Sequence, residues 1–270
     1  PTATPNGDWQ HGQRVTVLVM GIDQRPVENA SYANTDSLIL LTMNPISKTA
    51  GMLSIPRDLW VNLTSHGQDR INTAMASGGT VYAMHEVAKV LGVPIHHYVR
   101  VNFTALQKLV DLIGGIDVYV DQDINDQQYP DMNYHFDPFV ISAGMHHMDG
   151  ATALKYARTR HNTSDFYRMR RQQQVILAVR DRVLSIDALP NLAANASEIM
   201  GTMAGAVVSD LSVPEMVQLA LAAKDIPTEN ISKAVMDENV VQDYRTTGGA
   251  QVLILQPDKL PALIQRFNGQ

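Results

Sequence analysis

The sequence predicts an α/β protein in which helices cover both faces of a central β-sheet. Three apolar runs, at Val15–Met20, Ser37–Met43 and Ala50–Ile55, are continuous rather than alternating, which is typical of strands buried on both faces. After these runs, helical and strand-like patterns alternate along the chain, as they do in layered α/β domains. With 270 residues, of which 45% are hydrophobic and 18% charged, the chain can bury a large core.

The other elements follow from local patterns. A long helix is expected from Asn72 to Leu91, where apolar residues recur near helical spacing and Gly92 provides a stop, although Gly78-Gly79 interrupts the pattern. Further strands are expected at His97–Val101, Ile116–Val120, Ile231–Met236 and Gln251–Leu255. Further helices are expected at Thr104–Ile113, Asp149–Tyr156, Phe166–Ile186, Ala188–Met203, Val213–Ala223 and Pro257–Phe267. The segments expected to be loops are Gln24–Thr35, Arg57–Arg70 and Asp121–His147, and a loop as long as the last is usually functional or mobile.

We expect residues 1–12 to be a linker and residues 13–268 to form a single domain, because no second linker or internal repeat is visible. The linker is consistent with a cut in a longer protein from which an N-terminal membrane anchor was removed. No stretch of the chain approaches the ~20 apolar residues that a membrane-spanning helix needs.

Composition excludes several classes of function. The chain has no Cys, which rules out disulfides and thiolate chemistry. Its net charge of −6 and pI of about 5.8 disfavour a broad nucleic-acid-binding face. The His residues lack the spacing of a zinc site, and neither a Walker loop nor a G-x-S-x-G motif is present.

Positive charge is nevertheless concentrated in one segment. Eight of the 21 basic residues lie between Lys155 and Arg182, at the start of a predicted helix. Arg168 shares one face of that helix with Asp165 and Gln172, because they are three and four residues away. The first turn of a helix also attracts anions through its unpaired N–H groups. The pattern therefore predicts a phosphate or pyrophosphate site, with Arg158 and Arg160 in the approach to the helix. A solvated surface with Arg–Asp pairs is the alternative.

Acidic residues at strand ends suggest a metal. Asp23 follows the first predicted strand and Asp36 precedes the second, so the two carboxylates converge if these strands are antiparallel neighbours. Two oxygen ligands beside a phosphate site suit Mg²⁺, although two ordinary turn aspartates would look the same. In the S-I-P-R-D motif, Pro56 ends the third strand and directs Arg57 to the edge of the sheet. Asp58 there could orient a neighbouring arginine or form a surface ion pair of little value.

Eight motifs occur in one order along the chain: V-L-V-M-G-I-D, T-D-S-L-I-L-L, S-I-P-R-D-L-W-V, R-I-N-T-A-M-A-S-G-G, H-Y-V-R-V-N-F, L-V-D-L-I-G-G-I-D-V-Y-V, M-D-G-A-T-A-L-K-Y-A-R-T-R and D-F-Y-R-M-R-R-Q-Q-Q. Taken together, they resemble the LytR-CpsA-Psr family of cell-wall glycopolymer transferases. The resemblance extends from about Val15 to Val183. It implies a three-layer α/β/α fold with a central mixed β-sheet.

The resemblance also implies a function. Such enzymes transfer a glycopolymer, as glycosyl phosphate, from a polyprenyl-pyrophosphate lipid to peptidoglycan, and they are anchored in the bacterial membrane facing outward. Wall teichoic acid, capsule and arabinogalactan are known cargo types. A pyrophosphatase and a non-catalytic module that binds polyprenyl phosphate remain alternatives.

The resemblance assigns roles to individual residues. Mg²⁺, or Mn²⁺ in its place, is expected on Asp23 and Asp36. Pyrophosphate binding is expected from Arg57, Arg70, Arg158, Arg160, Arg168 and Gln172. Catalysis is expected to depend on Asp36, Arg57, Arg158, Arg160, Asp165 and Arg168. Asp36 and Asp58 are both candidates for the base that takes the acceptor proton.

Overall fold

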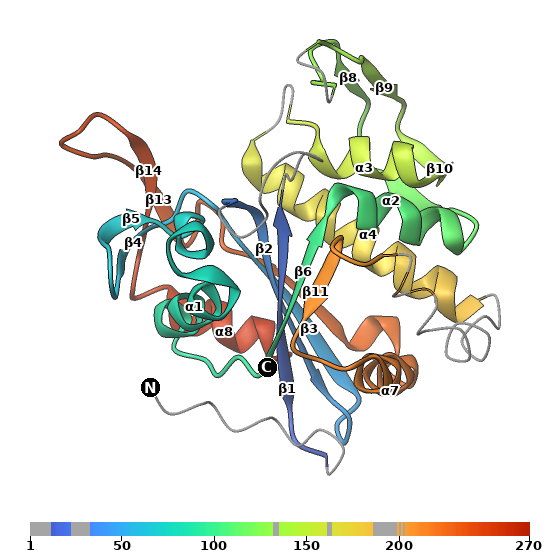
Figure 1. The fold of residues 1–270 in the computed structure, drawn as a ribbon, viewed down its shortest axis with the longest axis horizontal. Helices are drawn as coiled ribbons and strands as arrows, with labels where there is room; N and C mark the ends of the chain where they lie inside the picture. Colours follow the sequence, from blue (N-terminus) through green and yellow to red (C-terminus); the bar gives the residue numbers. More distant parts are fainter. Residues whose placement is uncertain are drawn as a thin grey trace. The chain divides into compact units, whose positions relative to one another are not determined.

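The computed structural model describes residues 12–22, 33–131, 135–160, 164–185, 199, 201 and 203–270 (Figure 1). The chain divides into two compact units, one formed by Pro1–Asn102 with Val207–Gln270 and the other by Phe103–Ala206. The expectation of a single domain over residues 13–268 stays a prediction. All but Gly12 of the expected linker lies outside the described residues.

The first unit is built on a six-stranded mixed sheet with the order β11-β6-β1-β2-β3-β12. Its strands are β1 (Val15–Ile22), β2 (Thr35–Asn44), β3 (Thr49–Ile55), β6 (His97–Asn102), β11 (Val207–Ser209) and β12 (Ile231–Val235). Strand β1 is antiparallel to β2 and parallel to β6. Strand β3 is antiparallel to β2 and parallel to β12. The mixed sheet confirms the fold class that the sequence predicts.

The pairing of β1 with β2 fixes where the chain returns to the edge of the sheet. The register runs from Val15 opposite Met43 to Ile22 opposite Thr35. A Cβ atom at Gly21 would lie 2.2 Å from Ser37 Oγ, so any larger residue here would force the Ser37 side chain to move. Asp36 therefore lies at the strand end where the sequence analysis expects it. Asp23 and the expected loop at 24–35, up to residue 32, lie outside the described residues.

Helices lie on both sides of this sheet (Figure 1). Helix α7 (Val213–Lys224) begins with a capping box between Ser212 and Glu215, and it packs on an apolar cluster around Val15, Met43 and Ile226. Helices α1 (Thr73–Leu91) and α8 (Leu260–Phe267) lie on the opposite side. Helix α1 is interrupted at Gly79, whose φ of 80° is left-handed, as the glycine pair in the sequence suggested.

Two β-hairpins extend the first unit, and only the strand at Gln251–Leu255 was predicted from the sequence. Strands β4 (Trp60–Leu63) and β5 (Gly67–Arg70) pair where a loop was expected, so the loop prediction for 57–70 is wrong. The strands are too short to show an alternating pattern. Strand β13 (Val241–Arg245) pairs with the predicted β14 (Gln251–Leu255). A short 3₁₀ turn, η3 (Thr228–Asn230), precedes β12.

In the residues that the structure describes, the second unit packs helices against short strands. The elements are α2 (Phe103–Leu112), β7 (Ile116–Val120), β8 (Ile124–Asp126), β9 (Phe139–Ile141), β10 (Gly144–Met148), α3 (Gly150–Arg158) and α4 (Asp165–Ser185). Strands β7 and β10 pair, as do β8 and β9, and both pairs are antiparallel. Their inward residues form one core with Tyr156 and Val175. The prediction of a loop at 121–147 is therefore wrong for β8, β9 and β10. The helix expected at 188–203 lies mostly outside the described residues.

Among the described residues, no helix is long and apolar enough to cross a membrane.

A buried carboxylate fastens the β4–β5 hairpin to α1. Glu86 is 2% exposed and accepts hydrogen bonds from Thr64 N at 3.1 Å and from Lys89 Nζ at 3.2 Å. Lys89 Nζ also donates to Asn62 O at 2.8 Å. Burial by itself raises the pKa of Glu86, but the hydrogen bonds from Thr64 and the charge of Lys89 outweigh burial and leave this pKa below its ordinary value.

We expect Glu86→Ala to lower the free energy of unfolding by about 1–3 kcal/mol at pH 7, because the Thr64 amide and Lys89 lose a buried acceptor. The folded-state pKa is depressed, so the charge of Glu86 stabilises the fold above the unfolded-state pKa and this contribution is lost as pH falls through the folded value. Urea unfolding at pH 7 and at about pH 3 should show the difference from wild type shrinking in acid. Glu86→Gln is the control that keeps the shape, and a difference independent of pH would contradict the account.

Candidate functional site

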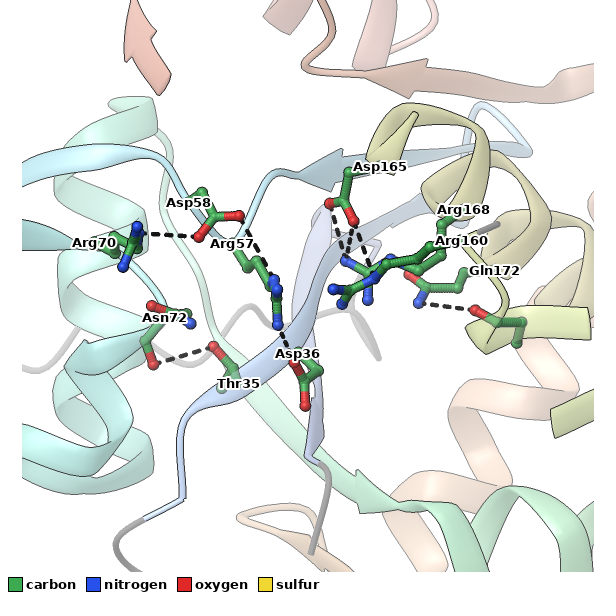
Figure 2. A network of polar contacts seen from close by, with 11 residues as sticks. Thr35, Asp36, Arg57, Asp58, Arg70, Asn72, Arg160, Asp165, Arg168 and Gln172 are labelled. Carbon is green, nitrogen blue, oxygen red and sulfur yellow. Dashed lines mark hydrogen bonds and ion pairs between the residues drawn. The ribbon is translucent and has the colours of Figure 1, made fainter. Parts of the chain in front are cut away.

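Charged side chains of the first unit form a row of alternating sign, which we call the first-unit cluster: Asp36, Arg57, Asp58 and Arg70 (Figure 2). Arg57 Nη1 lies 2.5 Å from Asp36 Oδ1. Asp58 lies between two guanidinium groups, with 3.6 Å to Arg57 Nε and 3.0 Å to Arg70 Nε. All four side chains are about a quarter to a third exposed, so the cluster is accessible to solvent.

Backbone hydrogen bonds bring these residues together from three segments. Asn72 N donates to Arg57 O at 3.3 Å, and Ile71 N donates to Leu59 O at 2.8 Å. Thr35 N donates to Asn72 O at 3.1 Å, and Thr35 Oγ1 donates to the same oxygen at 3.5 Å (Figure 2), so the start of β2 is tied to the start of α1. The Asp36, Arg57 and Arg70 side chains are therefore positioned by main-chain contacts that do not depend on a ligand.

Several polar atoms of this region are buried without a hydrogen bond. They include Arg57 Nε, Arg70 Nε and Asn72 Oδ1, for which the described residues supply no hydrogen-bond partner. The two Nε atoms face Asp58 only as an ion pair. Asn72 stands at the N-cap of α1, but its side chain makes no capping hydrogen bond. Buried polar atoms are usually satisfied, so these atoms mark a place where a ligand could complete the bonding.

The second unit holds a second group, the second-unit cluster: Arg160, Asp165, Arg168 and Gln172 (Figure 2). Arg168 Nη2 lies 2.8 Å from Asp165 Oδ1 and 2.9 Å from Oδ2, while Arg160 Nε lies 3.5 Å from the same carboxylate. Arg168 is 4% exposed although it is charged. Asp165 and Arg168 belong to the first turn of α4, where the helix dipole favours an anion. The shared helix face predicted from the spacing is thus present.

Gln172 is oriented by the end of α3. Its amide nitrogen donates to Ala157 O at 3.3 Å, and its Oε1 is buried without a hydrogen-bond partner in the described chain. This contact uses one of the two N–H donors of the Gln172 amide and directs Oε1 away from the Ala157 carbonyl. The expected role of Gln172 in pyrophosphate binding stays a prediction.

Arg158 is held by aromatic side chains. Its Nη1 donates to Tyr129 Oη at 3.0 Å, and its guanidinium lies 3.9 Å from the centre of the Phe103 ring. Tyr129 lies in the acidic segment between β8 and β9, so that segment contacts a predicted site residue. Stacking of this kind suits Arg better than Lys.

Tyr156 does not join Asp36 and Asp58 as a candidate for the general base. Burial raises the pKa of Tyr156 to about 12, and its hydroxyl donates to Gln174 Oε1 at 2.6 Å. Tyr156 therefore stays protonated at neutral pH. Both carboxylates that are candidates for the base are ion-paired, since Asp58 faces the guanidinium groups of Arg57 and Arg70 and Asp36 Oδ1 faces that of Arg57.

The metal prediction rests on Asp36, because Asp23 lies outside the described residues. In the part of the chain that the structure describes, no group of three or more His, Cys, Asp or Glu side chains could hold a metal ion. Mg²⁺ does not need such a group, since one or two carboxylates commonly hold it while water and phosphate oxygens complete the shell. The hard oxygen of Asp36 fits this requirement.

Comparison with known proteins decides the family. A model of the LytR_cpsA_psr family matches residues 2–267. The chain belongs to the LytR-CpsA-Psr family. This confirms the resemblance stated from the eight motifs, and the match extends beyond Val183, into the part of the chain where no motif was recognised.

Named relatives add detail to the LytR-CpsA-Psr assignment. The chain is 35% identical over 206 residues to the polyisoprenyl-teichoic acid–peptidoglycan teichoic acid transferase TagT of Bacillus subtilis, a match that covers 76% of this chain and 62% of the relative. The chain thus spans less than two thirds of that protein's length.

Solved structures agree with the fold. A crystal structure of B. subtilis TagV has a TM-score of 0.77 at 26% identity, covering 94% of this chain and 95% of that one. A structure described as the LytR-CPS2A-psr family protein YwtF (TagT) with bound octaprenyl pyrophosphate lipid has a TM-score of 0.70 at 28% identity, covering 95% and 91%.

The ion pair between Asp165 and Arg168 should contribute to stability, because it neutralises a buried guanidinium. We expect Asp165→Asn to lower the free energy of unfolding by about 1–3 kcal/mol. Asp181→Asn on the same helix is the matched control, since Asp181 is 52% exposed where it pairs with Arg180, and it should cost less than about 1 kcal/mol. Urea unfolding at neutral pH measures both, and equal losses would show that burial of Arg168 carries no penalty.

Proposed function

We propose that this LytR-CpsA-Psr protein is a phosphotransferase that moves a glycopolymer from a polyprenyl-pyrophosphate lipid to peptidoglycan during cell-wall assembly. The observation that carries the proposal is the arrangement at the start of α4, where Asp165 orients Arg160 and the buried Arg168. Arginines held in this way offer a fixed fork to phosphate oxygens. The name of TagT and the octaprenyl pyrophosphate bound in its structure support a polyprenyl-pyrophosphate lipid as the substrate class.

The second-unit cluster suits the charge of a pyrophosphate. Two guanidinium groups share one carboxylate in Arg160, Asp165 and Arg168, so the group keeps an excess of one positive charge by formal count. Because Arg168 is buried, its charge is weakly screened by water and acts strongly on a bound anion.

The first-unit cluster combines cations that can bind phosphate oxygens with carboxylates that can hold a metal ion. Arg57 and Arg70 supply donors for phosphate oxygens, and Asp58 holds both guanidinium groups in orientation. Asp36 would hold Mg²⁺, together with Asp23 as the sequence predicts, and Mn²⁺ has the same ligand preference. A bound Mg²⁺ would neutralise charge that develops on the phosphate oxygens.

The proposed reaction forms one bond to phosphorus and breaks another. The acceptor hydroxyl oxygen of a peptidoglycan sugar bonds to the phosphorus that carries the glycopolymer, and the bond from this phosphorus to the oxygen of the lipid phosphate breaks. The electron pair leaves with the lipid monophosphate, and the hydroxyl proton passes to a base, for which Asp36 and Asp58 are the candidates. Arg160 and Arg168 of the second-unit cluster stabilise the negative charge that grows on the departing phosphate.

We also propose where the protein acts and which polymer it transfers. Polyprenyl-linked polymers and peptidoglycan meet at the extracytoplasmic face of a bacterial membrane, where we place this protein with an N-terminal anchor. Teichoic acid is the cargo that the name of the TagT relative gives, and capsule polymer is a second cargo type that the family resemblance implies.

Transfer can be tested with a lipid-linked glycopolymer, peptidoglycan and Mg²⁺, with attached polymer as the measured product. We expect Arg168→Ala and Arg57→Ala each to reduce the rate by about 100-fold, because each removes a donor to the developing charge. Arg180→Ala is the matched control on α4, where Arg180 pairs with the exposed Asp181. Chelation of Mg²⁺ and Asp36→Asn should each abolish transfer.

The products separate the alternatives. Free glycosyl phosphate without attached polymer would identify a pyrophosphatase instead of a transferase. Lipid binding that is unaffected by chelation, with no turnover of any kind, would identify a non-catalytic polyprenyl-phosphate module and would refute the proposal.

A further inference from the structure

The segment that carries Arg158 and Arg160 leaves the end of α3, where backbone carbonyls lack helical partners. Thr159, the C-cap, donates its N–H to Lys155 O at 2.9 Å. The carbonyls that follow Lys155 need other donors, and the cation-attracting end of the helix dipole lies here.

Those donors come from α4, chiefly from Arg171. Arg171 Nε donates to Tyr156 O at 3.1 Å, and Arg171 Nη2 donates to Thr159 O. Gln172 occupies the carbonyl in between, that of Ala157. Neighbouring side chains on α4 therefore hold three backbone carbonyls on either side of Arg158.

The same segment is held from a second direction by Asp126. Thr159 Oγ1 donates to Asp126 Oδ2 at 2.6 Å, and both side chains are buried, with Asp126 at 4% and Thr159 at 2% exposure. Asp126 belongs to β8, in the acidic part of the second unit. Arg171 is also buried, at 6% exposure, and burial lowers the pKa of its guanidinium while Asp126 and Asp165 act in the opposite direction.

We propose that Arg171 is a positioning residue, which does not contact the substrate but fixes the backbone from which Arg158 and Arg160 extend. This inference rests on the proposed anion-binding function and extends it to a residue outside the expected site. A planar guanidinium can bond two carbonyls at once from a rigid fork, which Lys cannot do. Arg158 and Arg160 are long side chains, and fixing their backbone origin reduces the entropy lost when they bind an anion.

The reason for a charged residue at a buried position follows from the same contacts. A buried guanidinium is costly unless its donors are used, and here carbonyl oxygens at the negative end of α3 use them while Asp126 supplies a counter-charge. An apolar side chain of the same size would fill the space but leave the carbonyls of Tyr156 and Thr159 without donors.

The test measures binding of inorganic pyrophosphate with Mg²⁺ by calorimetry, together with amide hydrogen exchange of residues 155–160. We expect Arg171→Met to weaken pyrophosphate binding by about tenfold and to speed exchange in this segment. In an Arg158→Ala/Arg160→Ala background, the further loss from Arg171→Met should be less than about threefold, because Arg171 acts through these two arginines and the effects do not add. Arg170→Met, the neighbouring substitution, should leave affinity and exchange unchanged.

Other outcomes overturn the proposal or separate it from the proposed function. Unchanged exchange at 155–160, or a loss from Arg171→Met that adds fully to that of the Arg158→Ala/Arg160→Ala variant, would show that Arg171 does not position the segment. If wild type binds no pyrophosphate, the proposed function fails, and the exchange data alone decide the role of Arg171. If Arg171→Met does not fold, Arg171→Lys serves instead, since it keeps the charge but can reach only one carbonyl, and wild-type exchange in that variant would also refute the proposal.

Discussion

Guanidinium groups held by acceptors of the protein itself are the interaction on which the rest of the candidate site depends. Asp58 stands between Arg57 and Arg70, and Asp165 stands between Arg160 and Arg168. Without these carboxylates, like charges would repel one another and long side chains would sample many rotamers. In each unit, one carboxylate shared between two arginines prevents this repulsion and fixes the side chains. The cations are therefore ordered before an anion binds, as they are in preorganised electrostatic sites.

Much of the fold was predictable because its signals are local. The continuous apolar runs predicted β1, β2 and β3, and the antiparallel pairing of β1 with β2 places Asp36 at the strand end as expected. The second-unit cluster was visible because helical spacing alone relates Asp165 to Arg168 and Gln172. Motif order identified the family, whose model matches nearly the whole chain.

What escaped the sequence analysis depends on contacts between distant segments. The β4–β5 hairpin is fastened by Glu86, 22 residues beyond Thr64 in the chain, and its strands are too short for periodicity to reveal. Asn72 contacts Arg57 and Thr35 through its backbone atoms, so its residue type does not reveal these contacts. Arg171 looked like one more charge in a basic run. Nothing in its spacing shows that the carbonyls of Tyr156 and Thr159 need it, because that need arises only where α3 ends.

The β13–β14 hairpin meets the first-unit cluster through main-chain atoms. Leu253 N donates to Asp58 O at 3.0 Å, and Arg70 Nη2 donates to Gln251 O at 2.9 Å. Neither bond uses a side chain of the hairpin. Substitutions at its exposed positions, such as Gln242 and Tyr244, can therefore accumulate while the hairpin keeps its attachment to Arg70 and Asp58. This separation of attachment from side-chain identity lets the hairpin diversify among descendants of one ancestor while the charged residues beneath it stay the same.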